Sequence, residues 1–526
     1  MIGSLLRPLT DGLQDERIQY DKTADRCKIT PFLKVFMKAG RLTSQWVRLD
    51  FNQVADFGRQ ATVDLIRKGH FITRLFLVTS LPDISTIQTA GAAAAAPAQV
   101  KPNFGWTNSI GHALIQQAQL TISGDVVDTL DSNLLEILDE YYTPLEKVPA
   151  VNELIGRRDA DFNQTSIGYS TPNTVYVPLP FWFTRGDSAA ALPIDALAAD
   201  QVQLRFNFRA LQGCYYTDSR TTETFDPQVD GSALWPLSGA QLYAQNNSGT
   251  IIPGLNPADP TAKYIPLQGY KMPTTSQLHL GDTYLLAEYI YVDKPEANRF
   301  RVADLKYPVL QHYTIEPADN KAQAFTNIPI RVPNPARALY WVSQRYEVPA
   351  YNAHFLATRD LSANYPVLQC DVPVPQIEQR IWWPNAQGLQ DAAPPLKFIP
   401  AFSLRDSEPL NAVSFVYEGN LARFATTAPA LFRSILMGPL YTKTPWVNRY
   451  YYTMPFGLFP GTKPLTVHCG EANLDKLKRA ELRLQFAPKR GYQAPMTVDR
   501  YITRIYVETY NIFRVYGGRG SMLFSY

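Results

Sequence analysis

The chain has 526 residues, which is too long for one ordinary hydrophobic core and suits two or three domains. Hydrophobic residues make up 45% and charged residues 18%, while 41 Pro, 30 Tyr and 26 Phe favour strands and turns over helical bundles. Lys and Arg total 50 against 47 Asp and Glu, so no field of one sign is available to hold a nucleic acid by its phosphates. We therefore predict an all-β protein that does not bind nucleic acid directly.

The reactive residue types are scattered along the chain. The four cysteines show no Cys-x-x-Cys spacing and the six histidines are dispersed, which argues against a zinc module, a disulfide framework or a bound cofactor. The first ten residues lack the basic and apolar regions of a secretory leader, and no apolar run approaches the length of a membrane span. We expect a protein that is made in the cytosol and is kept or assembled there.

The N-terminal residues offer two interpretations. Leucines and one isoleucine recur at helical spacing over residues 2–13, which is typical of a short amphipathic helix, although Pro8 is tolerated only near its start. The alternative is an arm, residues 1–27, docked on the body. Strand patterns follow at residues 32–37, 45–51, 62–66 and 71–78.

Residues 81–105 hold five consecutive alanines among Gly and Pro and are predicted to form a long loop. A strand is expected at 117–123, ending in the Gly124-Asp125 turn. A short helix is expected at 134–142, capped by Ser132 or Asn133.

Two stretches about half a chain apart share one pattern. Residues 202–208 and 480–486 both alternate apolar with polar side chains, and each lies downstream of a Pro-Phe pair, Pro180-Phe181 or Pro455-Phe456. Because a period of two is typical of a half-buried strand, the chain is predicted to contain two copies of one β-sandwich.

The first copy carries a long loop at 211–280, whereas the matching connection in the second copy, 486–501, is short. Residues 284–292 are apolar on both faces, which predicts a strand covered on both sides where the two domains meet. The predicted domains are an arm at 1–27, a first sandwich at 28–300 and a second at 301–526.

Several blocks in order along the chain carry a resemblance to a known family. They are residues 106–115, 119–124, 180–185, 191–197, 285–293, 454–456 and 510–515. In these blocks the chain resembles the major capsid proteins of nucleocytoplasmic large DNA viruses.

The resemblance implies a double jelly roll, two tandem eight-stranded β-sandwiches with short helices and long loops. It further implies a homotrimer with a pseudo-hexagonal outline that tiles an icosahedral shell, with residues 211–280 in an external tower. The expected partners are other copies of the chain, minor capsid and penton proteins, and an inner membrane reached by the N-terminal arm. The expected location is the outer shell of the virion, assembled in the host cytoplasm.

Individual candidate residues carry weaker predictions. The aromatics Trp382, Trp383, Tyr450 and Tyr451 are candidates for contacts between subunits, with packing inside one domain as the alternative. Asn163 and Asn246 lie in glycosylation sequons. The Arg185-Gly-Asp-Ser tetrapeptide matches an integrin-binding motif but also follows an aromatic strand, where the family carries a similar sequence.

A competing hypothesis from another class is a carbohydrate-binding or carbohydrate-active β-sandwich protein, which exposed Trp and Tyr would suit. An enzyme of that class needs paired carboxylates in a groove. The sequence shows no cluster of catalytic residues, so we expect no enzymatic activity.

Overall fold

The computed structural model describes residues 41–83, 103–157, 174–218, 278–345 and, with short gaps, 354–357 and 408–524. The chain divides into two compact units, Met1–Leu42 and Thr43–Tyr526. Apart from Leu42 at the start of one strand, every element discussed below belongs to the second unit. The predicted strand at 32–37 and the N-terminal helix lie outside the described residues.

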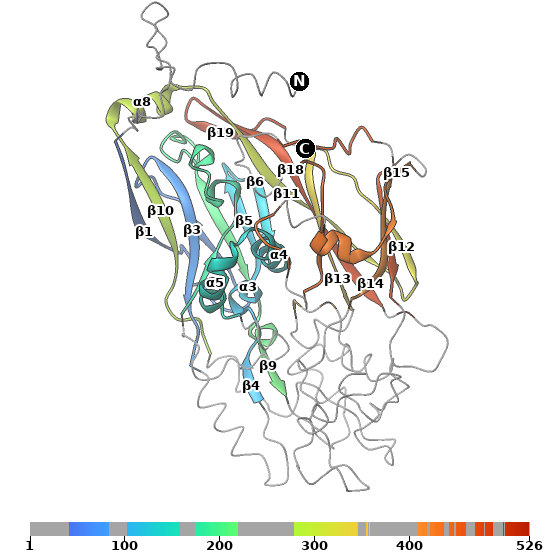
Figure 1. The fold of residues 1–526 in the computed structure, drawn as a ribbon. Helices are drawn as coiled ribbons and strands as arrows, with labels where there is room; N and C mark the ends of the chain where they lie inside the picture. Colours follow the sequence, from blue (N-terminus) through green and yellow to red (C-terminus); the bar gives the residue numbers. More distant parts are fainter. Residues whose placement is uncertain are drawn as a thin grey trace, which may run out of the picture. The chain divides into compact units, whose positions relative to one another are not determined.

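The first group of strands forms two four-stranded sheets (Figure 1). One sheet has the order β1 (Leu42–Asp50), β10 (Thr283–Val292), β3 (Phe71–Ser80) and β7 (Thr174–Pro178). The other has the order β2 (Gln60–Asp64), β8 (Val202–Phe208), β5 (Ile115–Ile122) and β6 (Asp125–Asp131). We call these two sheets the first sandwich.

The second group repeats this arrangement. One sheet has the order β11 (Leu305–Asp319), β18 (Tyr501–Tyr516), β13 (Ala336–Arg345) and β16 (Tyr451–Pro455), with β19 (Arg519–Met522) paired to β18. The other has the order β12 (Phe325–Pro329), β17 (Glu481–Phe486), β14 (Leu410–Tyr417) and β15 (Leu421–Thr427). We call these sheets the second sandwich.

The two sandwiches share one strand order. When the eight main strands of each sandwich are counted along the chain, one sheet holds the first, eighth, third and sixth strands, and the other holds the second, seventh, fourth and fifth. The sequence repeat is part of this duplication, because β8 and β17 each lie second in the matching sheet. Their apolar residues are buried on one face, as alternation predicts. The prediction of an all-β double jelly roll is therefore confirmed.

Two hydrophobic cores fill the sandwiches, and one of them extends beyond its own sandwich. The second core holds Leu339, Trp341 and Val507, which lie on one face of the β13–β18 sheet. Tyr340 and Tyr506, on the opposite face of the same strands, belong to the core of the first sandwich. The β13–β18 sheet is therefore covered on both faces.

The prediction that residues 284–292 are covered on both faces is wrong. In β10 buried residues such as Leu285 and Ala287 alternate with half-exposed ones such as Tyr284 and Leu286. The matching strand β18 is the one with packed neighbours on both sides. Composition alone could not separate the two strands, because both are rich in apolar residues.

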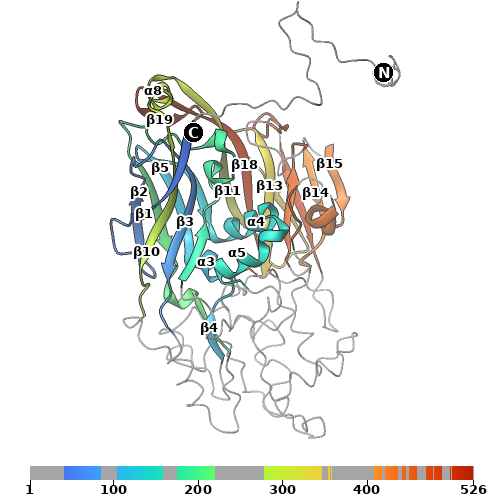
Figure 2. The same cartoon turned by 60° about the vertical axis from the view of Figure 1, so that its left-hand side comes forward.

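The loop predicted at 211–280 joins β8 to β10, and its described ends include β9 (Tyr215–Asp218). This strand pairs with β4 (Asn103–Trp106), which overlaps the end of the loop predicted at 81–105. Figures 1 and 2 show β4 at the end of the first sandwich opposite α8 (Lys294–Val302). Most of the 211–280 segment lies outside the described residues.

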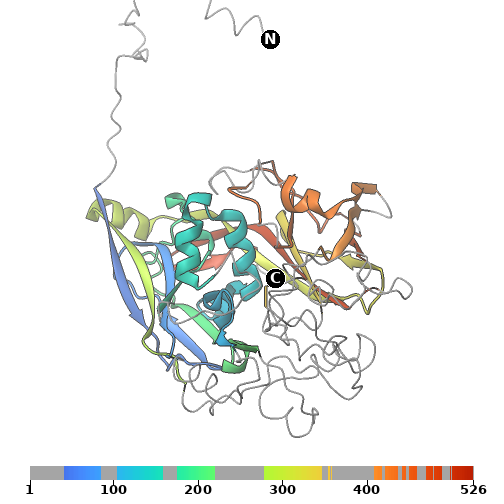
Figure 3. The ribbon, with the colours of Figure 1, turned by 60° about the horizontal axis from the view of Figure 1, so that its bottom comes forward.

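Three short helices, α3 (Ile110–Leu114), α4 (Ser132–Tyr142) and α5 (Val148–Ile155), pack against strands of the first sandwich. Helices α3 and α5 contact β7, and α4 contacts β5 and β6; Figure 3 shows the helices in teal. The predicted helix at 134–142 is confirmed as α4, but its predicted cap is wrong. Asp131 caps it, accepting a hydrogen bond from the Leu134 amide at 2.7 Å. The helix begins directly after β6, so the last strand residue takes the capping position. Within the described residues, no helix has the length and apolar character needed to cross a membrane.

Candidate functional site

Helix α4 carries three acidic side chains into the interior. Glu136, Asp139 and Glu140 are spaced three and four positions apart, so they lie on neighbouring positions of one helical face. All three are buried. Because an ionised carboxylate is costly to bury without a partner, each of them requires nearby cations.

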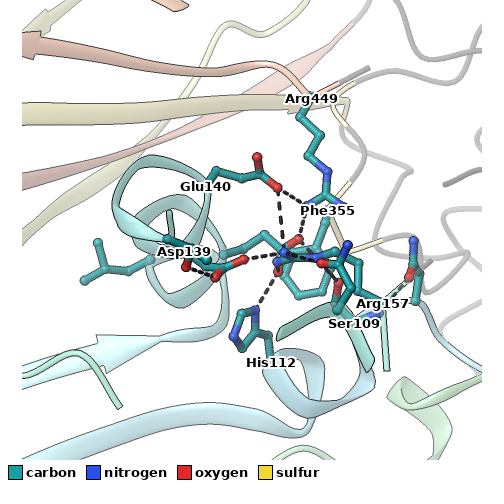
Figure 4. A network of polar contacts seen from close by, with 12 residues as sticks. Ser109, His112, Asp139, Glu140, Arg157, Phe355 and Arg449 are labelled. Atoms are coloured by element: carbon teal, nitrogen blue, oxygen red, sulfur yellow. Dashed lines mark hydrogen bonds and ion pairs between the residues drawn. The ribbon is translucent and has the colours of Figure 1, made fainter. Parts of the chain in front are cut away.

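The cations come from both halves of the chain (Figure 4). Arg157, just after α5, lies 2.5 Å from Glu136 and also pairs with Asp139. Arg449, just before β16, pairs with Glu136 and lies 2.7 Å from Glu140. The guanidinium of Arg449 thus ties the second half of the chain to a helix of the first half.

Two further side chains complete this group. The Nδ1 atom of His112 in α3 lies 2.6 Å from Glu136, and Arg157 Nε donates to the Ser109 hydroxyl at 3.0 Å. Lys443 lies 3.5 Å from Glu140. Glu140 is held by charge, since neither of its oxygens has a hydrogen-bonding geometry with a described residue. We call Glu136, Asp139, Glu140, Arg157, Arg449, Lys443 and His112 the α4 cluster.

The α4 cluster favours the ionised forms of Glu136 and Asp139. Burial opposes ionisation of Glu136, but the charges of Arg157 and Arg449 outweigh it and hold its pKa well below the usual range. Burial likewise opposes ionisation of Asp139, and the charge of Arg157 lowers its pKa overall. Arg157 loses solvent, yet the three carboxylates raise its pKa well above the ordinary value.

A second buried group forms around Glu508 of β18. Arg185, which follows the first sandwich's strand β7, pairs with Glu508 and stacks over the Tyr142 ring with its guanidinium carbon 5.0 Å from the centroid. His312 of β11 lies 3.8 Å from Glu508 through Nε2 and 3.1 Å from Asp128 of β6 through Nδ1. Burial opposes ionisation of Glu508, but Arg185 and Arg337 lower its pKa. We call this group the Glu508 cluster.

Tyrosine hydroxyls add hydrogen bonds between the same elements. Tyr142 and Tyr340 place their hydroxyl oxygens 2.9 Å apart, and Tyr141 donates to the Tyr451 carbonyl at 2.9 Å. Tyr506 donates to Asp131 at 2.6 Å. These bonds and the two clusters form a continuous buried contact between the sandwiches, which we call the junction.

The junction is suited to holding two modules in one arrangement. Buried ion pairs add little net stability over apolar packing, but removing one partner leaves an unpaired charge at a cost of about 3–5 kcal/mol. An arrangement of the two sandwiches that left one of these charges unpaired would carry that cost. Within the described ranges, no group of three or more His, Cys, Asp or Glu side chains is placed to hold a metal ion.

A separate cavity of about 470 Å³ opens on the outer face of the β2-β8-β5-β6 sheet. Its polar lining includes Gln60, Gln117, Asn207 and Asp131. Among the described residues that line it, Asp131 supplies the carboxylate, and it is already engaged by Tyr506 and the Leu134 amide. Glycoside hydrolysis needs two carboxylates across the bond, an arrangement different from this lining.

The residues singled out from the sequence fall mostly elsewhere. Asn163, Asn246, Trp382 and Trp383 lie outside the described residues. Tyr451 is buried at the junction, and Tyr450 is half-buried beneath the Arg433 guanidinium, 4.7 Å from its ring centroid. A role for these residues in contacts between chains, or in glycosylation, stays a prediction.

Sequence reasoning missed both clusters. One signal was available: three acids within five positions of an otherwise apolar helix, Glu136, Asp139 and Glu140, are unusual on a buried face. Arg185 was noted only as part of a tetrapeptide, whereas its side chain pairs with Glu508, 323 positions away. Neither partner could be identified from spacing.

Comparisons with known proteins agree with this architecture. A family model described as the N-terminus of major capsid proteins matches residues 30–245. Capsid protein 1 of Acanthamoeba polyphaga mimivirus is 22% identical over 356 residues, which cover 65% of this chain and 49% of that protein. Probable capsid protein 4 of the same virus is 25% identical over 217 residues, covering 41% and 39%. The chain thus spans less than half the length of these curated relatives.

A solved structure extends the likeness of fold to most of the chain. The quasi-atomic model of the PBCV-1 virus capsid is similar with a TM-score of 0.61 at 18% identity. The match covers 94% of this chain and 100% of that one. The similarity includes both sandwiches.

Proposed function

Because the chain belongs to the double jelly-roll major capsid proteins of nucleocytoplasmic large DNA viruses, we propose that it is a structural building block of the virion shell. Three copies associate into a capsomer with a pseudo-hexagonal outline, and capsomers tile an icosahedral surface by self-assembly. The chain acts through its form and carries out no reaction.

One observation carries this proposal: two sandwiches with the same strand order are fixed to each other by the junction. A chain that supplies two similar modules in a fixed arrangement lets three copies provide six. Many weak contacts, each repeated over the lattice, then give a stable shell. The domain division at 28–300 and 301–526 is part of the same proposal.

The remaining contacts of the capsomer follow from this role. Minor capsid and penton proteins are the proposed partners at the edges and vertices of the shell, and the arm at 1–27 is the proposed contact with an inner membrane. Assembly takes place in the host cytoplasm, and the finished protein lies in the outer shell of the particle.

The test is the mass and shape of the purified chain. Light scattering after size exclusion should give about three times 59.2 kDa, and negative-stain electron microscopy should show particles with a six-sided outline. A monomer at micromolar concentration would contradict the capsomer. Specific binding or cleavage of a glycan by the pure chain would favour the carbohydrate hypothesis.

A further inference from the structure

The second sandwich contacts the first at a further point, outside the two clusters of the junction. His354, Phe355 and Ala357 lie in the connection from β13 to β14, and all three are buried. The Nε2 atom of His354 lies 2.7 Å from the Gly213 carbonyl oxygen. Because a carbonyl can only accept, Nε2 carries a proton and donates it to this bond. We call this contact between His354 and Gly213 the latch.

Gly213 belongs to a well-fixed part of the first sandwich. It is the last residue of the short helical turn η4 (Leu211–Gly213), which lies just before β9. The Cys214 carbonyl accepts from the Thr107 amide at 2.9 Å, and this bond ties the turn to the end of β4. Arg209 covers the glycine so closely that a Cβ atom there would lie 2.8 Å from its Cδ atom. The latch therefore holds the base of the paired strands β4 and β9.

The charges nearest to the latch are positive. Arg209 donates to a backbone carbonyl of α3 at 2.7 Å and to the Ser132 hydroxyl at 3.0 Å. Arg504 of β18 donates to the side-chain oxygen of Gln344 at 2.8 Å, and Gln344 donates to the His354 carbonyl. Within the described part of the chain, both arginines are bound by neutral acceptors and neither forms an ion pair.

The other titratable groups of the packed elements are uncharged or already engaged. Burial raises the pKa of the Cys214 thiol to about 12 and raises the pKa of Tyr451 well above its usual range. The carboxylate whose charge acts on both arginines is Asp131, which accepts hydrogen bonds from the α4 backbone and from Tyr506. A proton added to His354 would therefore lie near two cations without an acidic partner among the described residues.

These surroundings keep His354 neutral. Burial and the charges of Arg209 and Arg504 hold the pKa of His354 well below its ordinary 6.5, although the bond to Gly213 opposes them. Once the latch opens, the imidazole regains water and titrates near pH 6.5. The open form thus takes up a proton at a higher pH than the closed form. The closed form is fully favoured above about pH 6.5, and the opening equilibrium rises up to about tenfold for each pH unit below it.

We propose that the latch is an acid-sensitive device that joins the second sandwich to the base of strands β4 and β9 and releases it when His354 is protonated. The added proton goes to Nδ1, because Nε2 already carries one. The resulting imidazolium is repelled by Arg209 and Arg504 and is stabilised by moving into water. The inference concerns a single chain and does not depend on the proposed capsomer.

The release is local because the junction keeps its charges in the same pH range. The pKa values of Glu136 and Glu508 are lowered from the ordinary 4.5, so both carboxylates remain ionised where a free histidine takes up its proton. The two sandwiches stay joined by the α4 cluster and the Glu508 cluster while the latch opens. Mild acid therefore changes one contact of the molecule and leaves the fold intact.

Amide hydrogen exchange of the full chain, read by mass spectrometry, measures how often the latch opens. The segments to follow are 209–214 and 354–357, one on each side of the contact, with rates corrected for intrinsic exchange at each pH. Between pH 7.5 and pH 5.5, the protection of both segments should fall about tenfold. The protection of β5, in the body of the first sandwich, should not change.

Two glutamine substitutions form a matched pair. His354→Gln keeps an amide donor for the Gly213 carbonyl but takes up no proton, so protection of the two segments should be equal at both pH values. His70→Gln replaces a histidine that accepts from the Val292 amide, close to α8, and should leave the tenfold fall unchanged. A fall that persists in His354→Gln, or its absence from the unmodified chain, would overturn the latch.

A second measurement covers the case in which His354→Gln does not fold, as judged by circular dichroism. Exchange of the imidazole Cε1 hydrogen in the unmodified chain follows the titration of each histidine. His354 should titrate below pH 6.5, and a midpoint at or above that value would contradict the inference. Light scattering of the same samples keeps the two proposals apart, since a monomer at pH 7.5 contradicts the capsomer and the exchange data alone decide the latch.

Discussion

Glu136 is fully buried and ionised, and its charge is balanced by arginines from two distant parts of the chain. The acidic pattern of the helix could be seen in the sequence, but its partners could not. Arg449 lies 313 positions away, and nothing in its local sequence distinguishes it from a surface arginine. The partner of a charged residue can therefore be predicted when the two are close in sequence, but not when only the fold brings them together.

Replacing Glu136 with glutamine should be strongly destabilising. The substitution leaves Arg157 and Arg449 with less negative charge in a fully buried site, and we expect a loss of about 3–5 kcal/mol in the free energy of unfolding. Urea denaturation measures it. Glu146→Gln, at an exposed position, is the control and should change stability by less than about 0.5 kcal/mol. Equal effects of the two substitutions would contradict the role given to the α4 cluster.

The same carboxylates predict how stability depends on pH. The pKa values of Glu136 and Glu508 are lowered by folding from the ordinary 4.5, so the unfolded chain takes up protons at a higher pH than the folded chain. Their contribution is therefore complete above about pH 4.5 and is lost as the pH falls through the folded-state values. The free energy of unfolding, measured from pH 7 to pH 3, should fall more steeply for the unmodified protein than for Glu136→Gln. Parallel curves would contradict this assignment.

At the scale of elements, alternation of apolar and polar residues was enough to predict β2, β3, β5, β8 and β17, and the helical pattern was enough to predict α4. Alternation and helical spacing failed as predictors where burial or capping depends on which other segment of the chain lies next to the element. β10 and β18 look alike in composition, yet only β18 has packed neighbours on both faces. The cap of α4 was misplaced because β6 runs directly into the helix, which makes a strand residue, Asp131, its first capping group.

Asp131 joins β6, α4 and β18, and a pair of substitutions separates its contacts. Asp131→Ala removes the cap, at about 0.5–2 kcal/mol, and removes the acceptor to which the Tyr506 hydroxyl donates, at about 1–3 kcal/mol more. Asp131→Asn keeps an acceptor for the Leu134 amide and should lose less stability in urea denaturation. Adding Tyr506→Phe to Asp131→Ala should recover part of the loss. If asparagine were as harmful as alanine, the cap would have no measurable role.

At the scale of the whole molecule, the junction makes two sandwiches into one cooperative unit. We expect differential scanning calorimetry of the unmodified chain at pH 7 to show one unfolding transition for both sandwiches. The Arg185→Ala, Arg449→Ala double variant removes a cation from each cluster and should separate this transition into two. Two transitions already present in the unmodified protein would show that the junction does not couple them. The duplication itself was visible in the sequence, whereas the junction depends on contacts that only the fold creates.

The connection between the last two main strands has a different length in each sandwich, and this difference lowers the symmetry of any assembly of the chain. The chain from β8 to β10 is several times longer than the chain from β17 to β18, although both link the same positions of the repeated strand order. A ring assembled from three such polypeptides would contain six sandwiches but only three copies of the longer segment, one for each chain. Its repeating unit would therefore be two unlike sandwiches, and a molecule that distinguishes the first sandwich from the second would bind the ring at three positions rather than six.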